Sequence, residues 1–313
     1  MSRAFVFPGQ GSQAVGMGKA LAAALPTARH LFEEVDDALR QNLTRLMFEG
    51  PEDELMLTAN AQPALMAVSM AVVRVLERDV GIDLATSCRF VAGHSLGEYS
   101  ALCAVGALRL DDAARLLRRR GEAMQEAVPV GEGAMAALLG LDIETAQSVA
   151  AAAAEGEVLD VANDNAPGQI VVSGHIGAVE RAIELAKEQG GRRSIRLPVS
   201  APFHCRLLAP AADVMAEALA EVEVGKPRTP LVANVTAAAV TDPEEIRSLL
   251  VEQVTARVRW REVVVFMRAQ EVDTQVELGA GKVLSGLARR IDRDLACIAV
   301  GAPEDVDAFV ESL

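Results

Sequence analysis

Short apolar runs alternate with amphipathic stretches along most of this 313-residue chain. Runs such as residues 4–7 and 88–92 have the length of buried strands, whereas residues 28–39 carry apolar side chains at helical spacing. Strands joined by helices pair in parallel, and a parallel sheet is covered by helices on both faces. The pattern therefore predicts an α/β fold whose large domain has a mainly parallel sheet flanked by helices.

In the segment from residue 133 to residue 196, the expected strands and helices follow one another more closely. We expect strand 134–139, helix 143–154, strand 158–162, a turn at 163–168, strand 170–173, helix 176–188 and strand 193–197. The order β-α-β-β-α-β is that of the ferredoxin-like unit. This predicts a large domain made of residues 1–130 and 199–313, with an inserted ferredoxin-like βαββαβ subdomain at residues 131–198.

Composition narrows the classes of function. The chain has 44 acidic and 30 basic residues, a net charge of −14 and no long basic run, so we expect no nucleic-acid and no membrane partner. Four cysteines without a Cys-x-x-Cys pair indicate free thiols in a reducing compartment and no metal site. No apolar stretch has the length of a bilayer span, and Pro8-Gly9 interrupts the first one too early for a signal peptide. We expect a cytoplasmic protein, and a monomer because nothing demands an oligomer.

A serine lies on a sharp turn between an expected strand (88–92) and an expected helix (96–104). The segment Gly93-His94-Ser95-Leu96-Gly97 fits Gly-x-Ser-x-Gly, the nucleophile elbow of hydrolase-like cores. The glycines avoid clashes, the serine Oγ projects above the sheet edge, and the next N–H, that of Leu96, can stabilise an oxyanion at the helix N-terminus. Such pentapeptides also occur in non-catalytic turns, but this context favours Ser95 as a nucleophile.

A serine hydroxyl needs a base within hydrogen-bond reach. The chain offers only His30, His94, His175 and His204. His204 lies in an irregular, Pro-rich loop, where catalytic groups concentrate, and the others are better explained by helix, packing or capping roles. Because residues 205–313 follow His204, the Ser–acid–His order of an α/β-hydrolase triad fits poorly. A dyad whose imidazole is oriented by backbone carbonyls is the alternative.

Two Gly-rich segments need separate interpretations. Residues 7–13 follow the first strand and open at the same sheet edge as the elbow, so Gln10 could lie beside the oxyanion. Residues 9–14 also fit a loose dinucleotide fingerprint, but that motif needs a second strand about 20 positions on, where residues 29–37 indicate a helix. Residues 279–282 resemble a P-loop but lack its first glycine and its Ser/Thr.

Arginines gather on the expected helix 111–127, at Arg115, Arg118, Arg119 and Arg120. We expect most of them to be solvated. One that faced inward would form a bidentate clamp for a carboxylate substrate.

Taken together, six segments resemble those of the malonyl-CoA:acyl carrier protein transacylases. They are residues 5–13 (FVFPGQGSQ), 93–101 (GHSLGEYSA), 120–129 (RGEAMQEAVP), 165–169 (NAPGQ), 203–204 (FH) and 279–284 (GAGKVL). The resemblance extends in order from the N-terminus to about residue 300. As a set these motifs are highly specific.

The resemblance implies a ping-pong transfer of malonyl from coenzyme A thioester to the phosphopantetheine thiol of acyl carrier protein in fatty-acid biosynthesis. Malonyl-CoA is then a substrate, and no cofactor is expected. The site residues that it implies are the catalytic pair Ser95 and His204, the oxyanion-hole N–H groups of Gln10 and Leu96, and the substrate-binding residues Arg120, Gln253, Phe203 and Asn165. In this assignment Arg120 pairs with the malonyl carboxylate, and the Gln253 backbone carbonyl orients the imidazole.

Other functions remain open at this point. Residues 256–260 (ARVRW) depart from the Asn-Pro-Val-x-Trp that is frequent in the family, near Gln253. A serine hydrolase or thioesterase would use the same nucleophile and base, with water as the acceptor. A non-catalytic carrier-protein binder would keep the elbow without using it. The carrier could also belong to a polyketide or malonate decarboxylase system.

Overall fold

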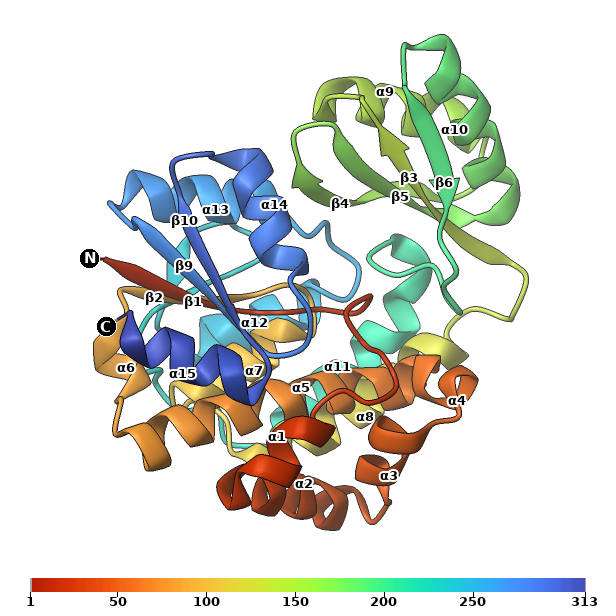
Figure 1. Ribbon diagram of the computed structural model, residues 1–313. Coiled ribbons are helices and arrows are strands. Elements are labelled where there is room, and N and C mark those ends of the chain that lie inside the picture. Colours follow the sequence, from red (N-terminus) through yellow and green to blue (C-terminus); the bar gives the residue numbers. More distant parts are fainter. Residues whose placement is uncertain (1, 313) are drawn as a thin grey trace.

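The computed structural model describes residues 2–312 and shows a larger unit on a mainly parallel sheet, with a smaller unit beside it (Figure 1). Within those residues the larger sheet has six strands, which are, in spatial order, β10 (Ala296–Val300), β9 (Thr274–Leu278), β1 (Arg3–Phe7), β2 (Phe90–Gly93), β7 (Leu231–Val232) and β8 (Ala239–Val240). Only β7 and β8 pair antiparallel. The parallel pairing of β1 and β2 brings the loops that follow them to one sheet edge.

Helices cover both faces of this sheet because its buried strands are apolar on both sides. Phe5 and Phe7 pack into one hydrophobic cluster with the N-terminal helices, and Ala4 and Val6 pack into the other with the helices around Trp260. The helices of the larger unit are α1 (Lys19–Ala24), α2 (Pro26–Leu39), α3 (Leu43–Glu49), α4 (Glu52–Met56), α5 (Thr58–Val75), α6 (Leu84–Ser87), α7 (Gly97–Ala104), α8 (Leu110–Glu126), α11 (Ala209–Ala220), α12 (Pro243–Glu252), α13 (Trp260–Ala269), α14 (Val283–Ile291) and α15 (Pro303–Glu311). The predicted α/β class is confirmed.

The smaller unit is an antiparallel sheet with two helices and its own apolar core. Its elements are β3 (Gly133–Leu139), α9 (Ile143–Ala154), β4 (Leu159–Ala166), β5 (Gln169–His175), α10 (Ile176–Glu188) and β6 (Arg193–Arg196), and the spatial strand order is β4-β5-β3-β6. This is the predicted βαββαβ unit. In Figure 1 it lies to one side of the larger unit, with α9 and α10 on its outer face.

The predicted turn at residues 163–168 is wrong over most of its length. Strand β4 continues through Ala166, with irregular register after Val161 and after Asp164, and the turn is confined to Pro167 and Gly168. Two partners hold this polar stretch extended. The N–H of Asp164 donates to Val258 O, and the buried Asp164 carboxylate pairs with Arg261 of the larger unit. Tertiary pairing thus overrides the turn preference of the Asn-Asp-Asn sequence.

The expectation that no apolar stretch has the length of a bilayer span is wrong for one helical stretch. Thr58–Val80 comprises α5 and the π-helical turn η1 (Leu76–Val80) and is long and apolar enough to cross a membrane. In the structure, 89% of the residues in its apolar window are buried inside the protein. It packs against α2 and α8, which also contact each other, so its apolar composition is explained by its place in the core.

Two glycines make the turn after β2 possible because the chain passes too close there for a side chain. A Cβ on Gly93 would lie 1.8 Å from the carbonyl carbon of Gly97, and a Cβ on Gly97 would lie 2.3 Å from Phe7 O. Both of these atoms belong to the backbone, which cannot move aside without breaking the turn.

We therefore expect Gly93→Ala to lower the free energy of unfolding by at least about 1–3 kcal/mol, because the added methyl group overpacks the elbow. Gly286→Ala is the matched control: no atom lies within 4 Å of its added Cβ, so alanine should stabilise α14 by up to about 1 kcal/mol. Urea unfolding of both variants measures the difference. Equal midpoints for Gly93→Ala and the wild type would contradict this account of the turn.

Candidate active site

Ser95 lies at the turn between β2 and α7 with its backbone in the left-handed region, at φ 52°. Asn234, just beyond β7, stabilises this strained turn from both sides. Its Oδ1 accepts from the Ser95 N–H at 2.8 Å, and its Nδ2 donates to Gly93 O at 2.7 Å. Because β7 pairs with β2, the sheet places Asn234 next to the elbow. The elbow is thus built as predicted, with a support that the sequence did not reveal.

The predicted base reaches the predicted nucleophile. His204 Nε2 lies 2.8 Å from Ser95 Oγ, and His204 Nδ1 lies 2.9 Å from the backbone oxygen of Gln253. A carbonyl can only accept, so Nδ1 carries the proton and Nε2 is left to take the proton of the serine hydroxyl. The orienting group is a backbone carbonyl rather than a carboxylate, which is the dyad arrangement expected from the chain order.

Burial makes His204 a neutral base. The side chain is 4% exposed, and burial together with the positive charge of Arg120 lowers its pKa to about 3. The imidazole is therefore unprotonated throughout the neutral pH range. The neutral imidazole can therefore accept a proton. Because its pKa is low, the protonated form is stable only when a negative charge lies next to it.

Arg120, on α8, is a buried cation that faces the nucleophile. Its guanidinium donates to Ser95 Oγ at 3.1 Å, to Gln253 Oε1 at 2.8 Å and to Gln62 Oε1 at 2.7 Å, and it lies 5.8 Å from the ring centre of Tyr99. All of these partners are neutral. Among residues 2–312 its Nε has no hydrogen-bond partner, and the side chain is 1% exposed. This arginine is therefore suited to an anionic group placed next to Ser95.

The two predicted oxyanion-hole residues both lie near the serine. Leu96 directly follows Ser95 at the start of α7, and Gln10 lines the same cavity as Ser95. In the described part of the chain, neither backbone N–H donates to another backbone group. The Gln10 side chain is held by Thr58, whose Oγ1 donates to Gln10 Oε1 at 2.9 Å. Both N–H groups thus remain available to an oxygen anion.

A cavity of about 310 Å³ connects these groups and lies between the two units. The larger unit contributes the predicted catalytic side chains, and the smaller unit contributes an apolar and amide wall. Asn165, on β4, is held by His94, whose Nε2 lies 2.8 Å from Asn165 Oδ1. The residues around the cavity are Gln10, Gly11, Gln13, Met56, Gln62, His94, Ser95, Arg120, Met124, Met135, Asn163, Asn165, Val171, Leu197, Pro198, Val199, Phe203 and His204.

Of the eight predicted site residues, six line this cavity and two stand behind it. Leu96 and Gln253 are buried beneath the surface. The backbone oxygen of Gln253 contacts His204 and its side chain contacts Arg120, whereas the role predicted for Leu96 needs only its backbone N–H. Sequence reasoning missed Gln62 and Asn234, and treated Glu98 only as a residue of a helix first turn. Gln62 and Asn234 belong to no recognisable motif, so only the fold could identify them.

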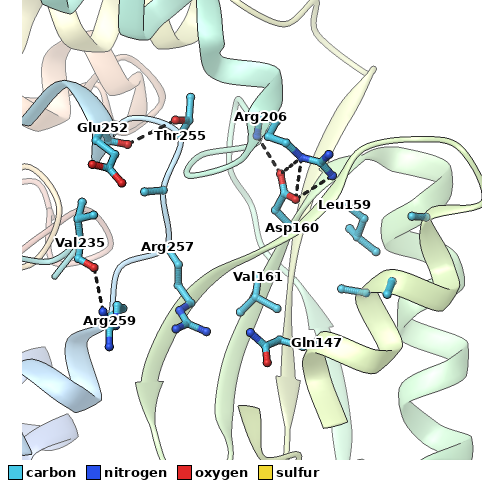
Figure 2. A pocket seen from close by; sticks show the side chains of 14 residues that line it. Gln147, Leu159, Asp160, Val161, Arg206, Val235, Glu252, Thr255, Arg257 and Arg259 are labelled. Carbon is cyan, nitrogen blue, oxygen red and sulfur yellow. Dashed lines mark hydrogen bonds and ion pairs between the residues drawn. The ribbon is translucent and has the colours of Figure 1, made fainter. Parts of the chain in front are cut away.

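A second cavity, of about 650 Å³, lies between α9, the start of β4 and residues 252–259 (Figure 2). Its three arginines are already paired: Arg206 binds Asp160 through its guanidinium and its backbone N–H, and Arg257 and Arg259 share Glu262. Figure 2 shows the Asp160–Arg206 pair at its rim. Because Arg206 follows His204 by two residues, this pair anchors the base-bearing loop to the smaller unit. The cavity contains no predicted catalytic residue.

Because the His204 pKa is near 3 rather than 6.5, the reaction of Ser95 with a serine-directed fluorophosphonate should be nearly independent of pH between about pH 5 and about pH 7.5. The measurement is the labelling rate across this range, with His204→Ala as the control that loses labelling. A half-maximal rate near the ordinary histidine pKa would contradict this description of the site.

The acyl transferase domain family matches residues 4–292. The malonyl CoA-acyl carrier protein transacylase of Bacillus subtilis (strain 168) is 47% identical over 311 residues, which cover 99% of this chain and 96% of that one. The acyl-carrier-protein-S-malonyltransferase structure from Bartonella henselae is 55% identical, with a TM-score of 0.97 over 100% of this chain and 99% of that one. A malonyl-transacylase in complex with its type II PKS acyl-carrier protein is 42% identical, with a TM-score of 0.97 over 100% of both chains. The chain therefore belongs to the acyl transferase domain family and, within it, to the malonyl CoA-acyl carrier protein transacylases.

Proposed function

We propose that this protein transfers the malonyl group from malonyl-CoA to the phosphopantetheine thiol of acyl carrier protein through a malonyl ester of Ser95. The observation that carries the proposal is the buried Arg120, a cation with only neutral partners that lies 3.1 Å from the nucleophile. A malonyl thioester carries both features that the site requires: a carbonyl for Ser95 to attack and a free carboxylate for the guanidinium.

The first half-reaction forms the ester. Ser95 Oγ attacks the thioester carbonyl carbon while His204 Nε2 takes the hydroxyl proton. The resulting oxyanion lies between the N–H groups of Leu96 and Gln10. When the tetrahedral intermediate collapses, the C–S bond breaks, and the coenzyme A sulfur leaves with the proton from His204. The Nδ1–H bond to Gln253 O stabilises the transient imidazolium.

The second half-reaction reverses these steps with a different thiol. The phosphopantetheine thiol of the carrier protein gives its proton to His204 and attacks the malonyl ester carbonyl. The C–O bond to Ser95 then breaks, and His204 returns the proton to Oγ. A thiol rather than water is favoured because apolar side chains such as Met135, Val171 and Phe203 line the cavity. A hydrolase would instead need a held water, and no feature of the site favours one.

Arg120 accounts for the choice of malonyl over acetyl. A buried guanidinium without a counter-ion is costly, and the malonyl carboxylate neutralises it, whereas acetyl leaves it uncompensated. Phe203 and the His94–Asn165 pair lie around the remaining acyl space, and we assign them to substrate binding. The reaction needs no cofactor, since malonyl-CoA supplies the activated acyl group.

The acceptor that we propose is the carrier protein of fatty-acid biosynthesis, in the cytoplasm. A polyketide carrier protein is the second candidate, because the similar malonyl-transacylase noted above was solved with its type II PKS acyl-carrier protein. Transfer rates to the two kinds of carrier protein distinguish these acceptors.

Incubation of the wild type with malonyl-CoA should increase the mass of the protein by one malonyl group, located on the peptide that contains Ser95. Ser95→Ala should show no increase, because no other hydroxyl is paired with a base in the cavity. Intact-protein mass spectrometry followed by peptide mapping measures both. Malonyl on another residue, or release of coenzyme A by water faster than by the carrier thiol, would contradict the proposed function.

Arg120→Ala should lower kcat/KM for malonyl transfer by about 100-fold or more and change acetyl transfer by less than about 5-fold, because only malonyl has a carboxylate to lose its partner. Arg120→Lys keeps the positive charge but loses the planar pair of N–H donors of the guanidinium, so its kcat/KM for malonyl transfer should lie between those of the wild type and Arg120→Ala. Arg115→Ala is the matched control, since this arginine on the same helix is half-exposed and pairs with Asp111 and Asp112. Equal losses for malonyl and acetyl would refute the clamp.

A further inference from the structure

A buried carboxyl group lies behind the active site and takes no part in the steps above. Glu98, in the first turn of α7, is 1% exposed. Its Oε1 accepts from the backbone N–H of Asn234, and its Oε2 accepts from Gln253 Nε2, both at 2.5 Å. Both of its neighbours contact the catalytic machinery, Asn234 through the elbow and Gln253 through His204 and Arg120. Burial of an acidic group is costly, so its place here calls for a reason.

The Gln253 side chain works in only one orientation. Its Nε2 donates to Glu98 and to Ser95 O, and its Oε1 accepts from Arg120 at 2.8 Å. Reversing the amide would turn Nε2 toward the guanidinium, so that two donors would face each other. An ionised carboxylate offers only acceptors, and therefore it selects the orientation that keeps Oε1 on Arg120.

We propose that Glu98 is a positioning residue for malonyl selectivity: it fixes the Gln253 amide so that Oε1 holds the Arg120 guanidinium beside Ser95. The proposal rests on the function proposed above and adds to it a residue that touches neither substrate nor nucleophile. When it is ionised, Glu98 also places a negative charge one residue removed from Arg120, although it does not contact the guanidinium and leaves the place beside Ser95 open to a substrate carboxylate.

The protonation state of Glu98 then controls the orientation of the Gln253 amide. The charged or titratable groups that face it are Arg120 from α8 and Tyr99 from its own helix, whereas Asn234 and Gln253 are neutral. Burial raises the pKa of Glu98 to about 8, against the opposing effects of its two hydrogen bonds and of Arg120. Below that pH the protonated carboxyl has a hydrogen to donate, which favours the reversed Gln253 amide. The hold on Arg120 therefore strengthens as pH rises through about 8.

The test compares malonyl-CoA and acetyl-CoA as donors to acyl carrier protein. In Glu98→Gln, an amide oxygen can still accept from Asn234 N–H, but its NH₂ group opposes that of Gln253. We expect kcat/KM for malonyl to fall about 10-fold or more and that for acetyl to change less than about 2-fold. Glu277→Gln is the matched control, since Glu277 is also buried but binds only the start of α14. It should lower stability and leave the malonyl-to-acetyl ratio unchanged.

The wild type provides an independent readout. Its malonyl-to-acetyl ratio should rise with pH around 8, and the ratio for Glu98→Gln should be flat over the same range. Glu98→Asp keeps a titrating carboxyl and should retain a pH-dependent ratio. Equal losses for both donors in Glu98→Gln, or a flat ratio in the wild type, would overturn the proposal; the wild-type measurement decides even where a variant fails to fold. Absence of a malonyl ester on wild-type Ser95 would instead refute the proposed function.

Discussion

The buried positive charge of Arg120 is the constraint around which the site is organised. A guanidinium with 1% exposure has lost its water, and its protein partners are amide and hydroxyl oxygens. These contacts fix the position of the guanidinium but do not neutralise its charge. The proposed nucleophile and base and the cavity lie around this guanidinium, so in the proposed function a substrate carboxylate neutralises the charge next to the reacting serine.

The hydrogen bonds around this arginine form one continuous network. It extends from Gln10 through Thr58 and Gln62 to Arg120, and from there through Gln253 to Glu98 and Asn234. Its members come from the loop after β1 and from α5, α7, α8 and the segments after β7 and α12. A connected buried network restricts the movement of its members, which keeps the predicted oxyanion donors and the dyad in fixed relation.

The smaller unit is attached to this framework mainly through one strand. Strand β4 contacts the larger unit by Asp160 with Arg206, by Asp164 with Arg261 and Val258, and by Asn165 with His94. The first and last of these pairs lie close to His204 and Ser95 in sequence. The unit that closes the cavity is therefore bonded to the same segments that bear the dyad, so the cavity shape and the dyad geometry are coupled.

Local pattern was enough to predict the βαββαβ unit, the parallel sheet and Ser95, because apolar periodicity and the Gly-x-Ser-x-Gly spacing are properties of neighbouring residues. His204 followed from the small number of histidines, and Arg120 and Gln253 from family resemblance. The extended course of residues 163–166, the partners of Glu98 and the role of Asn234 were not accessible in this way. Those features depend on contacts across more than 90 positions of chain, such as Asp164 with Val258 and Glu98 with Asn234, which only the folded sheet brings together. The sequence by itself determined which groups are available for the proposed chemistry. The tertiary structure decided which of them are buried, paired and charged, because burial and pairing depend on neighbours in space.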